Sequence, residues 1–398
     1  MARRRRGRHF AGVEQSRHAR VARTWALAVR PLALAHALAC APNDDGLPVV
    51  ARGRYVEIAT ARDEPVCAGT AAYMDRVIDS VFAVMNESPP DHPYVRFEWL
   101  ELDEEDPVIG GGRASFSGDG VLIRSDVHLV QEHELVHAVQ MHAWPMPNDF
   151  LFEGHAVLLD PKRVAQDAYP WPATASLDEL IGARDIPGGD YPLAWFIVSQ
   201  IVLDHGFDGL REFWHAVPRG STAAEVRAAY EELFGRSIDA LIEPYVVEYS
   251  PPFGPQEIER RACDFALCPA PEVTPWQGDQ WTALGPLGCE DDPDAIGPDR
   301  RPSDWGEVWR DYTLIGDPAF YGFEYGAGSS VSIAACALNC DYQSTGIGGA
   351  EGPPFSSVPA YRGWWDSPMR VEVRAALVDL PTETPAVATI TRTFEPPQ

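Results

Sequence analysis

The sequence predicts a mixed α+β protein that continues into a β-rich segment. Short strand-like runs come first, helix-periodic runs follow, and residues 263–398 combine many Gly, Pro, Trp and Asp residues with short β-like runs. Hydrophobic residues make up 45% and charged residues 23% of the 398 residues, as in a globular chain with a sizeable core. We therefore expect one domain over residues 51–250 and a β-rich domain over 263–398, with a proline-rich boundary between them.

The first half of residues 51–250 alternates strand and helix patterns. Tyr55–Ala59 and Tyr94–Leu100 are predicted strands, the second because its apolar and polar residues alternate. Thr70–Met85 carries apolar residues at helical spacing and is a predicted helix. A Gly-rich turn then leads to a further predicted strand at Val121–Arg124.

The second half of this domain is predicted to be helical. The first helix runs from about Asp126, as its N-cap, to His142, because Pro145 and Pro147 prevent its continuation. The second begins near Asn148. Further helices are predicted at about residues 176–182, 191–205, 207–217, 222–234 and 238–247.

An H-E-x-x-H motif, formed by His133, Glu134 and His137, lies on the first of these helices. Four-residue spacing puts both imidazoles on one helix face, where a single Zn²⁺ can bind them at about 2.0–2.1 Å. Glu134 can then reach a water at the metal as a general base. The alternative is a buried helix that carries two surface histidines by chance, and the apolar residues around the motif favour the metal site.

A catalytic zinc site needs a third protein ligand and one open position. Glu153 follows the motif, and two helices joined by a proline-containing turn can bring it over the His pair. The alternative for Glu153 is a solvated acid near a helix start. His155 is a rival ligand, but residues two apart point to different helix faces, so we expect it to be a surface or core residue.

With these motifs the sequence resembles the gluzincin peptidases, in particular the bacterial peptidase MA-like family. That family combines H-E-x-x-H with a later E-G preceded by an apolar residue, and the resemblance covers roughly residues 51–250. It implies a zincin-like fold, with a small β-containing N-terminal subdomain and a helical C-terminal one. It also implies Zn²⁺ bound by His133, His137 and Glu153, and peptide-bond hydrolysis with Glu134 as general base.

The resemblance continues at Tyr191, which precedes an apolar helix. A tyrosine there can donate a hydrogen bond to the oxyanion of the reaction, although aromatic packing at a helix start is the alternative. A carboxylate is expected to orient one zinc-bound histidine, and Asp160 is the candidate. Thermolysin-type enzymes place an Asp four residues after the third ligand, where this chain has Val157, so the orienting group is expected to differ.

Residues 1–39 are predicted to be a targeting segment. They contain nine arginines and one acid, followed by apolar stretches and the A-x-A pattern Ala37-Leu38-Ala39. Cys40 follows directly and resembles the lipidated cysteine of bacterial lipoproteins, although Ala37 stands where Leu is usual. Cys40 is thus a candidate lipid anchor, with plain cleavage or a free thiol as alternatives, and residues 40–50 are an expected linker. The protein is predicted to be exported to the cell envelope or beyond.

Charge and cysteine content agree with export. The formal charge is −27, and the first 39 residues contribute about +8, so −27 − 8 = −35 remains on the rest. Such an acidic body repels nucleic acid and anionic membranes, so we expect no nucleic-acid partner, although mere solubility explains the charge equally well. A peptide or protein substrate is what the motif and the resemblance imply. Of the seven cysteines, the six other than Cys40 allow three disulfides. Parity leads us to expect a partner for Cys67 in the C-terminal segment.

The β-rich segment carries less information about function. Val331–Ala337, Arg370–Leu377 and Ala386–Arg392 are predicted strands of a disulfide-braced β-sandwich. Its role would be surface attachment, substrate recruitment or stability. Its tryptophans are expected to pack in the core rather than form a binding face: Trp305, Trp309, Trp364 and Trp365.

A second function from a different class is a non-catalytic cell-surface binding lipoprotein that keeps a peptidase fold. Such a protein usually lacks the general base or a metal ligand, and this chain has all four residues. The sequence therefore favours the enzyme.

Overall fold

The computed structural model gives the placement of most of the N-terminal two thirds of the chain and of the strands that follow. The residues it describes are 46–101, 112–126, 128–160, 177–186, 190–241, 274–283, 289, 292–300, 306–315, 319–325, 329–335, 358–363, 368–376 and 388–393. The predicted targeting segment, Cys40 and most of the predicted helix at 238–247 lie outside these residues. So do the following Cys and Trp residues: Cys263, Cys268, Cys336, Cys340, Trp305, Trp364 and Trp365.

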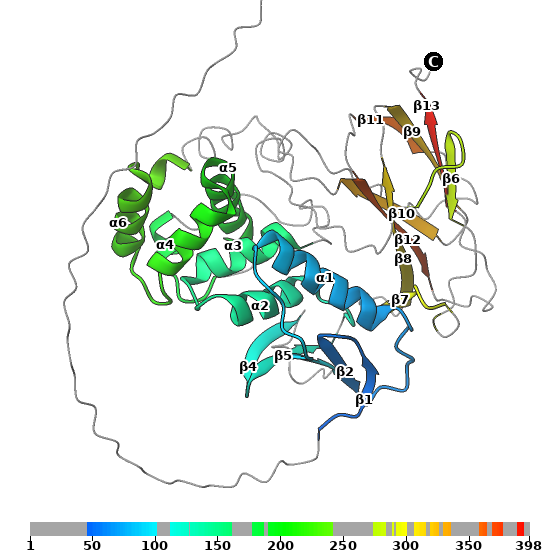
Figure 1. Ribbon diagram of the computed structural model, residues 1–398, viewed down its shortest axis with the longest axis horizontal. Helices are drawn as coiled ribbons and strands as arrows, with labels where there is room; N and C mark the ends of the chain where they lie inside the picture. The colour runs from blue at the N-terminus through cyan, green and yellow to red at the C-terminus, as the bar shows by residue number, and fades with distance from the viewer. Residues whose placement is uncertain are drawn as a thin grey trace, which may run out of the picture. The chain divides into compact units, whose positions relative to one another are not determined.

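A five-stranded sheet comes first in the chain (Figure 1). Its order is β1-β2-β3-β5-β4, with parallel pairing from β2 through β5 and antiparallel strands at both edges. The strand bounds are Val49–Arg52, Val56–Thr60, Val95–Trp99, Arg113–Ser117 and Gly120–Ser125 for β1 to β5. The predictions at β2, β3 and β5 are confirmed. Strand β1 begins inside the expected linker, and β4 was not predicted because most of its residues are exposed and lack apolar alternation.

Helix α1 (Thr70–Val84) connects β2 to β3 and confirms its prediction. Those two strands are parallel, so the chain needs a crossover element between them, and the helix supplies it. The residues of its inner face are fully buried and include Met74, Val77 and Val81. Helix α1 also packs against α2, the helix that carries the H-E-x-x-H motif.

Helix α2 (Glu132–Ala143) starts later than the sequence predicts. Asp126 is not its N-cap, because the cap is Gln131 and the described residues between β5 and Gln131 are not helical. Arg62 from the loop after β2 stabilises this extended stretch, since its Nη1 donates to the backbone oxygen of Asp126 at 3.0 Å and to that of Leu100 at 2.6 Å. The interaction is long-range, so it leaves no local signal in the sequence.

Helix α3 (Asp149–Leu159) begins as predicted, directly after Asn148. The Asn148 side chain accepts a hydrogen bond from Phe150 N at 3.2 Å, and this satisfies one of the free amides at the helix start. Two further bonds from Asn148 Nδ2 reach the backbone oxygens of Ile181 and Ser221, at 2.9 and 3.1 Å. The cap therefore also holds α3 against the helices that follow.

Three helices complete this part: α4 (Leu177–Gly182), α5 (Tyr191–Ala216) and α6 (Ala223–Phe234). The predicted break between 191–205 and 207–217 is confirmed, because Gly206 inside α5 has φ 71° and ψ 178°, which is not helical. Among the residues described, the structure holds no helix with the length and apolar character required to cross a membrane.

The β-rich segment contains two antiparallel four-stranded sheets, ordered β10-β12-β8-β7 and β11-β9-β13-β6. The predictions at β10, β12 and β13 are confirmed. A ring contact of 4.8 Å between Trp281 and Tyr312 joins the two sheets. The strand bounds are Gln280–Ala283, Ile296–Arg300, Gly306–Ile315, Ala319–Tyr325, Ser329–Ala335, Val358–Gly363, Pro368–Ala376 and Ala388–Thr393 for β6 to β13.

The start of α1 is attached to the β-rich segment by a set of contacts that we call the α1–β7 joint. A disulfide links Cys67 to Cys289, as expected for Cys67, and thus ties the two parts of the chain together. Thr70 Oγ1 lies 3.0 Å from Gly297 O and 3.1 Å from Gly297 N. The joint is completed by a perpendicular ring contact: Tyr73 and buried Trp309, with centroids 6.2 Å apart.

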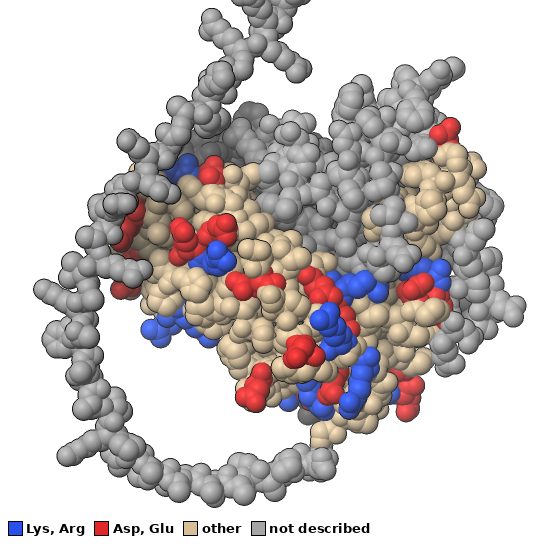
Figure 2. Space-filling model, in the orientation of Figure 1, with Lys and Arg blue, Asp and Glu red and all other residues tan. Residues whose placement is uncertain are grey.

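Charged side chains of both signs are interspersed on the face of the described residues shown in Figure 2. Several form ion pairs across neighbouring strands, such as Arg124 with Glu98 and Arg52 with Glu57. Exposed pairs of this kind contribute little stability, about 0–1 kcal/mol each. On this face the excess of acidic residues in the sequence does not produce a patch of one sign.

Candidate metal centre

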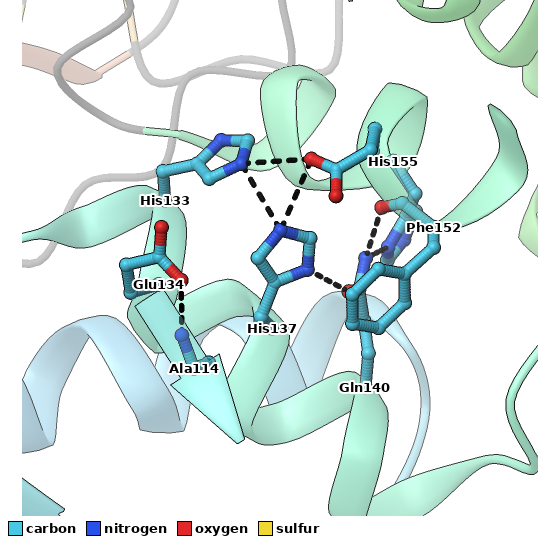
Figure 3. Close-up of polar contacts among 8 residues, drawn as sticks. Ala114, His133, Glu134, His137, Gln140, Phe152 and His155 are labelled. Atoms are coloured by element: carbon cyan, nitrogen blue, oxygen red, sulfur yellow. Dashed lines mark hydrogen bonds and ion pairs between the residues drawn. The ribbon is translucent and has the colours of Figure 1, made fainter. Parts of the chain in front are cut away.

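Helix α2 carries His133 and His137 on one face, one turn apart, as the motif predicts (Figure 3). Their Nε2 atoms lie 3.0 Å apart, and their rings are nearly perpendicular at 89°. Two imidazole nitrogens therefore point at one common position rather than past each other.

Helix α3 brings Glu153 to the same position. Its Oε2 lies 3.2 Å from His133 Nε2 and 3.3 Å from His137 Nε2. The next residue, Gly154, allows this approach: a Cβ there would lie 2.5 Å from the backbone oxygen of Ala194 on α5, which no side chain permits. The glycine of the Glu-Gly pair thus lets α3 pack directly on the α5 backbone.

The triangle formed by the three ligand atoms fits one metal ion. Its edges are 3.0, 3.2 and 3.3 Å. A tetrahedral ion with bonds of about 2.0–2.1 Å has ligand atoms separated by roughly 3.3–3.4 Å, so the observed edges agree to within a few tenths of an ångström. Among the described residues, these three form the one group of His, Cys, Asp or Glu side chains suited to holding a metal.

The hydrogen bonds around His137 indicate the role of its Nδ1. Gln140 Nε2 lies 3.1 Å from Phe152 O, which can only accept, and this fixes which end of the Gln140 amide is the NH₂ group. Gln140 Oε1, 2.7 Å from His137 Nδ1, must then accept from that nitrogen. In the neutral Nδ1–H form, His137 Nε2 carries a lone pair that faces the Glu153 oxygen. Either a proton on Nε2 or a metal ion shared with Glu153 satisfies these two facing atoms.

The charges in the centre couple strongly to one another. Burial alone would lower the pKa of His133, but its hydrogen bond to Glu153 and the charges of Glu134, Glu153 and Asp160 together raise it. Burial would raise the pKa of Glu153, yet the charges and hydrogen bonds of His137 and His133 hold it well below its usual range. Glu153 is therefore ionised, as a metal ligand must be.

The centre is only partly closed. The side chain of His137 is 5% exposed, whereas those of His133 and Glu153 are 19% and 18% exposed. His133 and Glu153 thus keep part of their side-chain surface in contact with solvent, and three protein ligands leave one of the four positions of a tetrahedral metal ion free.

Glu134 lies beside the triangle and is not part of it. Its Oε2 accepts a hydrogen bond of 2.8 Å from the backbone N–H of Ala114 on β4 (Figure 3). A Cβ at Gly112, just before this strand, would lie 3.0 Å from the Glu134 side chain, so the backbone passes close to the carboxylate. The sheet therefore holds Glu134 from the opposite side to the helices.

Tyr191, at the start of α5, lies over His133. The two rings are nearly parallel at 11°, with centroids 5.8 Å apart. Burial raises the pKa of the Tyr191 hydroxyl, and so do the charge of Glu153 and a hydrogen bond to it, so the hydroxyl keeps its proton. Tyr191 thus offers a hydrogen-bond donor at the edge of the centre.

Sequence reasoning missed two contacts of His137. Gln140 is the group that holds its Nδ1, where a carboxylate such as Asp160 was expected. Phe152 stacks on the His137 ring, with centroids 4.0 Å apart and an angle of 15°. The available signal for Gln140 was that it is an uncharged polar residue on the otherwise apolar face of the motif helix. His155 is fully buried and bonded to Gln140, so the prediction that it points away from the metal is confirmed.

No protein-family model matches the chain, and no curated protein matches it either. The geometry of the centre is therefore the basis for the function argued next.

Proposed function

We propose that this protein is an exported zinc-dependent peptidase with a zincin-like fold over residues 51–250. The observation that carries the proposal is the convergence of His133, His137 and Glu153 on one position, with Glu134 directly beside it. Two imidazoles and one carboxylate with an open side are a donor set that suits catalytic Zn²⁺. Export is supported by the Cys67–Cys289 disulfide, because such bonds persist in oxidising compartments.

Each group around the centre would have a separate role in hydrolysis. Zn²⁺ bound by the three ligands would polarise a substrate carbonyl and lower the pKa of a water molecule. Glu134 would take a proton from that water as its oxygen attacks the carbonyl carbon, and would then deliver the proton to the leaving amine. The Tyr191 hydroxyl would donate a hydrogen bond to the carbonyl oxygen as negative charge develops there.

An extended peptide fits the surroundings of Glu134. Strand β4 is one of the two edge strands of the described sheet, and the backbone N–H of Ala114 in this strand donates to Glu134. Peptides commonly bind by adding a strand to such an edge, with backbone hydrogen bonds that do not depend on sequence. A substrate paired with β4 would pass the reacting centre in extended form, which favours a peptide over other hydrolysable substrates.

Metal content tests the first half of the proposal. Elemental analysis of the purified protein should find about one zinc per chain, and His133→Ala should lose it. His142→Ala is the matched control, since it removes an exposed histidine from the same helix and should keep the metal. A wild-type protein without zinc after incubation with Zn²⁺ would rule out the proposed centre.

Activity tests the second half. Glu134→Gln should keep its zinc but lose roughly 100- to 10,000-fold in turnover of a casein or peptide-library substrate, because the general base is gone. Equal turnover in this variant would contradict the mechanism. Zinc binding without any peptide hydrolysis in the wild type would instead favour the non-catalytic surface protein.

A further inference from the structure

A buried chain of hydrogen bonds leads from the metal-binding face of α2 into the helical core (Figure 3). It runs from His137 Nδ1 to Gln140 Oε1 at 2.7 Å, and from Gln140 Nε2 to His155 Nδ1 at 2.7 Å and to Phe152 O at 3.1 Å. Gln140 is 1% exposed and His155 is 0% exposed. We call these four residues the Gln140 relay.

From the relay we infer that Gln140 is the positioning residue of the proposed metal site: it fixes the tautomer and rotation of His137 so that Nε2 faces the metal. A neutral imidazole can carry its proton on either nitrogen, and only the Nδ1–H form has a lone pair on Nε2. By accepting from Nδ1, Gln140 selects that form. The inference rests on the proposed metal site, although the tautomer itself exists without the metal.

Phe152 and Gln140 restrict different motions of the His137 ring. The Phe152 ring stacks on the imidazole and limits its tilt, but a stacked face does not distinguish the two nitrogens. Gln140 lies three residues after His137, on the neighbouring turn of the same helix face, and reaches the ring edge. Of these two side chains, only Gln140 therefore distinguishes the two ring nitrogens.

A glutamine is suited to this position because the relay needs an acceptor and a donor on one side chain. Its oxygen serves His137, while its nitrogen serves Phe152 O and His155. An ionised Glu would accept from His137 but leave the Phe152 carbonyl without a donor. It would also add a buried negative charge near Glu153, whereas the amide adds none.

His155 terminates the relay in an apolar setting. Its Nδ1 accepts from Gln140, so its proton is on Nε2. Its ring lies between Trp144, Phe207 and Trp214, with centroids 5.9, 6.2 and 5.6 Å away. The residue that the sequence offered as a rival ligand thus acts on the metal centre indirectly, through the amide that it orients.

Three variants and one control test the relay by zinc affinity, measured by competition with a chelator. Gln140→Met keeps the shape but makes no hydrogen bond, and should weaken zinc binding about 10- to 100-fold. Gln140→Glu restores the acceptor and should recover most of that loss. His155→Phe removes one of the two acceptors of the Gln140 NH₂ group and leaves the other, Phe152 O, in place. It should therefore have the smallest effect on zinc affinity. Gln200→Met, the same change elsewhere in the helices, should bind zinc as the wild type does.

The tautomer is read directly by ¹H–¹⁵N correlation spectra of the histidine rings in the folded, metal-free protein. We expect His137 in the Nδ1–H form in the wild type and a shift toward Nε2–H in Gln140→Met. An Nε2–H form in the wild type would overturn the inference even if every variant failed to fold. Unchanged zinc affinity and unchanged tautomer in folded Gln140→Met would overturn it too. A wild type that binds no zinc would instead count against the proposed function.

Discussion

The metal centre and the α1–β7 joint are held together in opposite ways. The centre joins residues that are at most 20 positions apart in sequence, such as His133 and Glu153. The joint connects residues more than 200 positions apart, with 222 between Cys67 and Cys289 and 227 between Thr70 and Gly297. The centre consists of side chains that converge on one position, whereas the joint is a disulfide with hydrogen bonds beside it.

This difference indicates that the two regions contribute to stability in different ways. Metal-binding free energy becomes folding free energy where only the folded chain forms the site, so the stability of the centre is expected to depend on metal. The joint closes a long loop and restricts the unfolded chain, so it is expected to stabilise the protein with or without metal. The two regions can be perturbed separately, and the following experiments do so in order of expected effect.

Metal removal should act on the centre alone. With zinc at about 1,000 times its Kd, the wild type should gain roughly 4 kcal/mol in unfolding free energy over the chelated protein, because metal binds only the folded state. Urea titrations with Zn²⁺ and with chelator measure this. His133→Ala should have the same unfolding free energy with Zn²⁺ and with chelator. If the wild type also showed no difference, the expected dependence of the centre on metal would be wrong.

Loss of the disulfide should act on the joint alone. The double substitution Cys67→Ala and Cys289→Ala should lower the unfolding free energy by about 2–4 kcal/mol, chiefly by freeing the unfolded chain. Zinc affinity should stay within about twofold, since the effects of distant sites on free energy add independently. A large fall in zinc affinity would mean that the joint also shapes the centre.

Thr70→Val should have the smallest effect of the three. The valine keeps the shape of the threonine but removes the acceptor of the Gly297 N–H, which costs about 1–3 kcal/mol in a buried setting, while Gly297 O keeps its hydrogen bond from Cys67 N. Thr282→Val, an exposed position in β6, is the control and should change little. Equal stability of both variants would show that the joint relies on the disulfide alone.

The same contrast explains what the sequence predicts well. The motif helix, the helix start near Asn148 and the break at Gly206 follow from local spacing, and all three are confirmed. The late start of α2 is set by Arg62, and the exposed edge strand β4 by pairing with β5, so neither leaves a local pattern. Cysteine parity predicted a partner for Cys67, but only three-dimensional packing identifies it as Cys289.

At the site itself, spacing predicted the residues that the structure brings together: His133, His137 and Glu153. It did not predict Gln140, because the role of an amide depends on which groups lie at both of its ends. A carboxylate was expected there from chemistry alone. The structure instead places a neutral relay, whose other end is a residue first considered as a ligand.

The close approach of Gly154 to the α5 backbone extends the sequence motif of the site. Its neighbours Glu153 and His155 point in opposite directions, one to the metal position and one to Gln140, while the glycine itself touches the α5 backbone. Each letter of H-E-x-x-H-x-x-Q followed by E-G-H then has its own physical reason to be invariant. Genomes can be screened for that longer signature, and chains that carry it should share this buried glutamine even where nothing else in their sequences aligns.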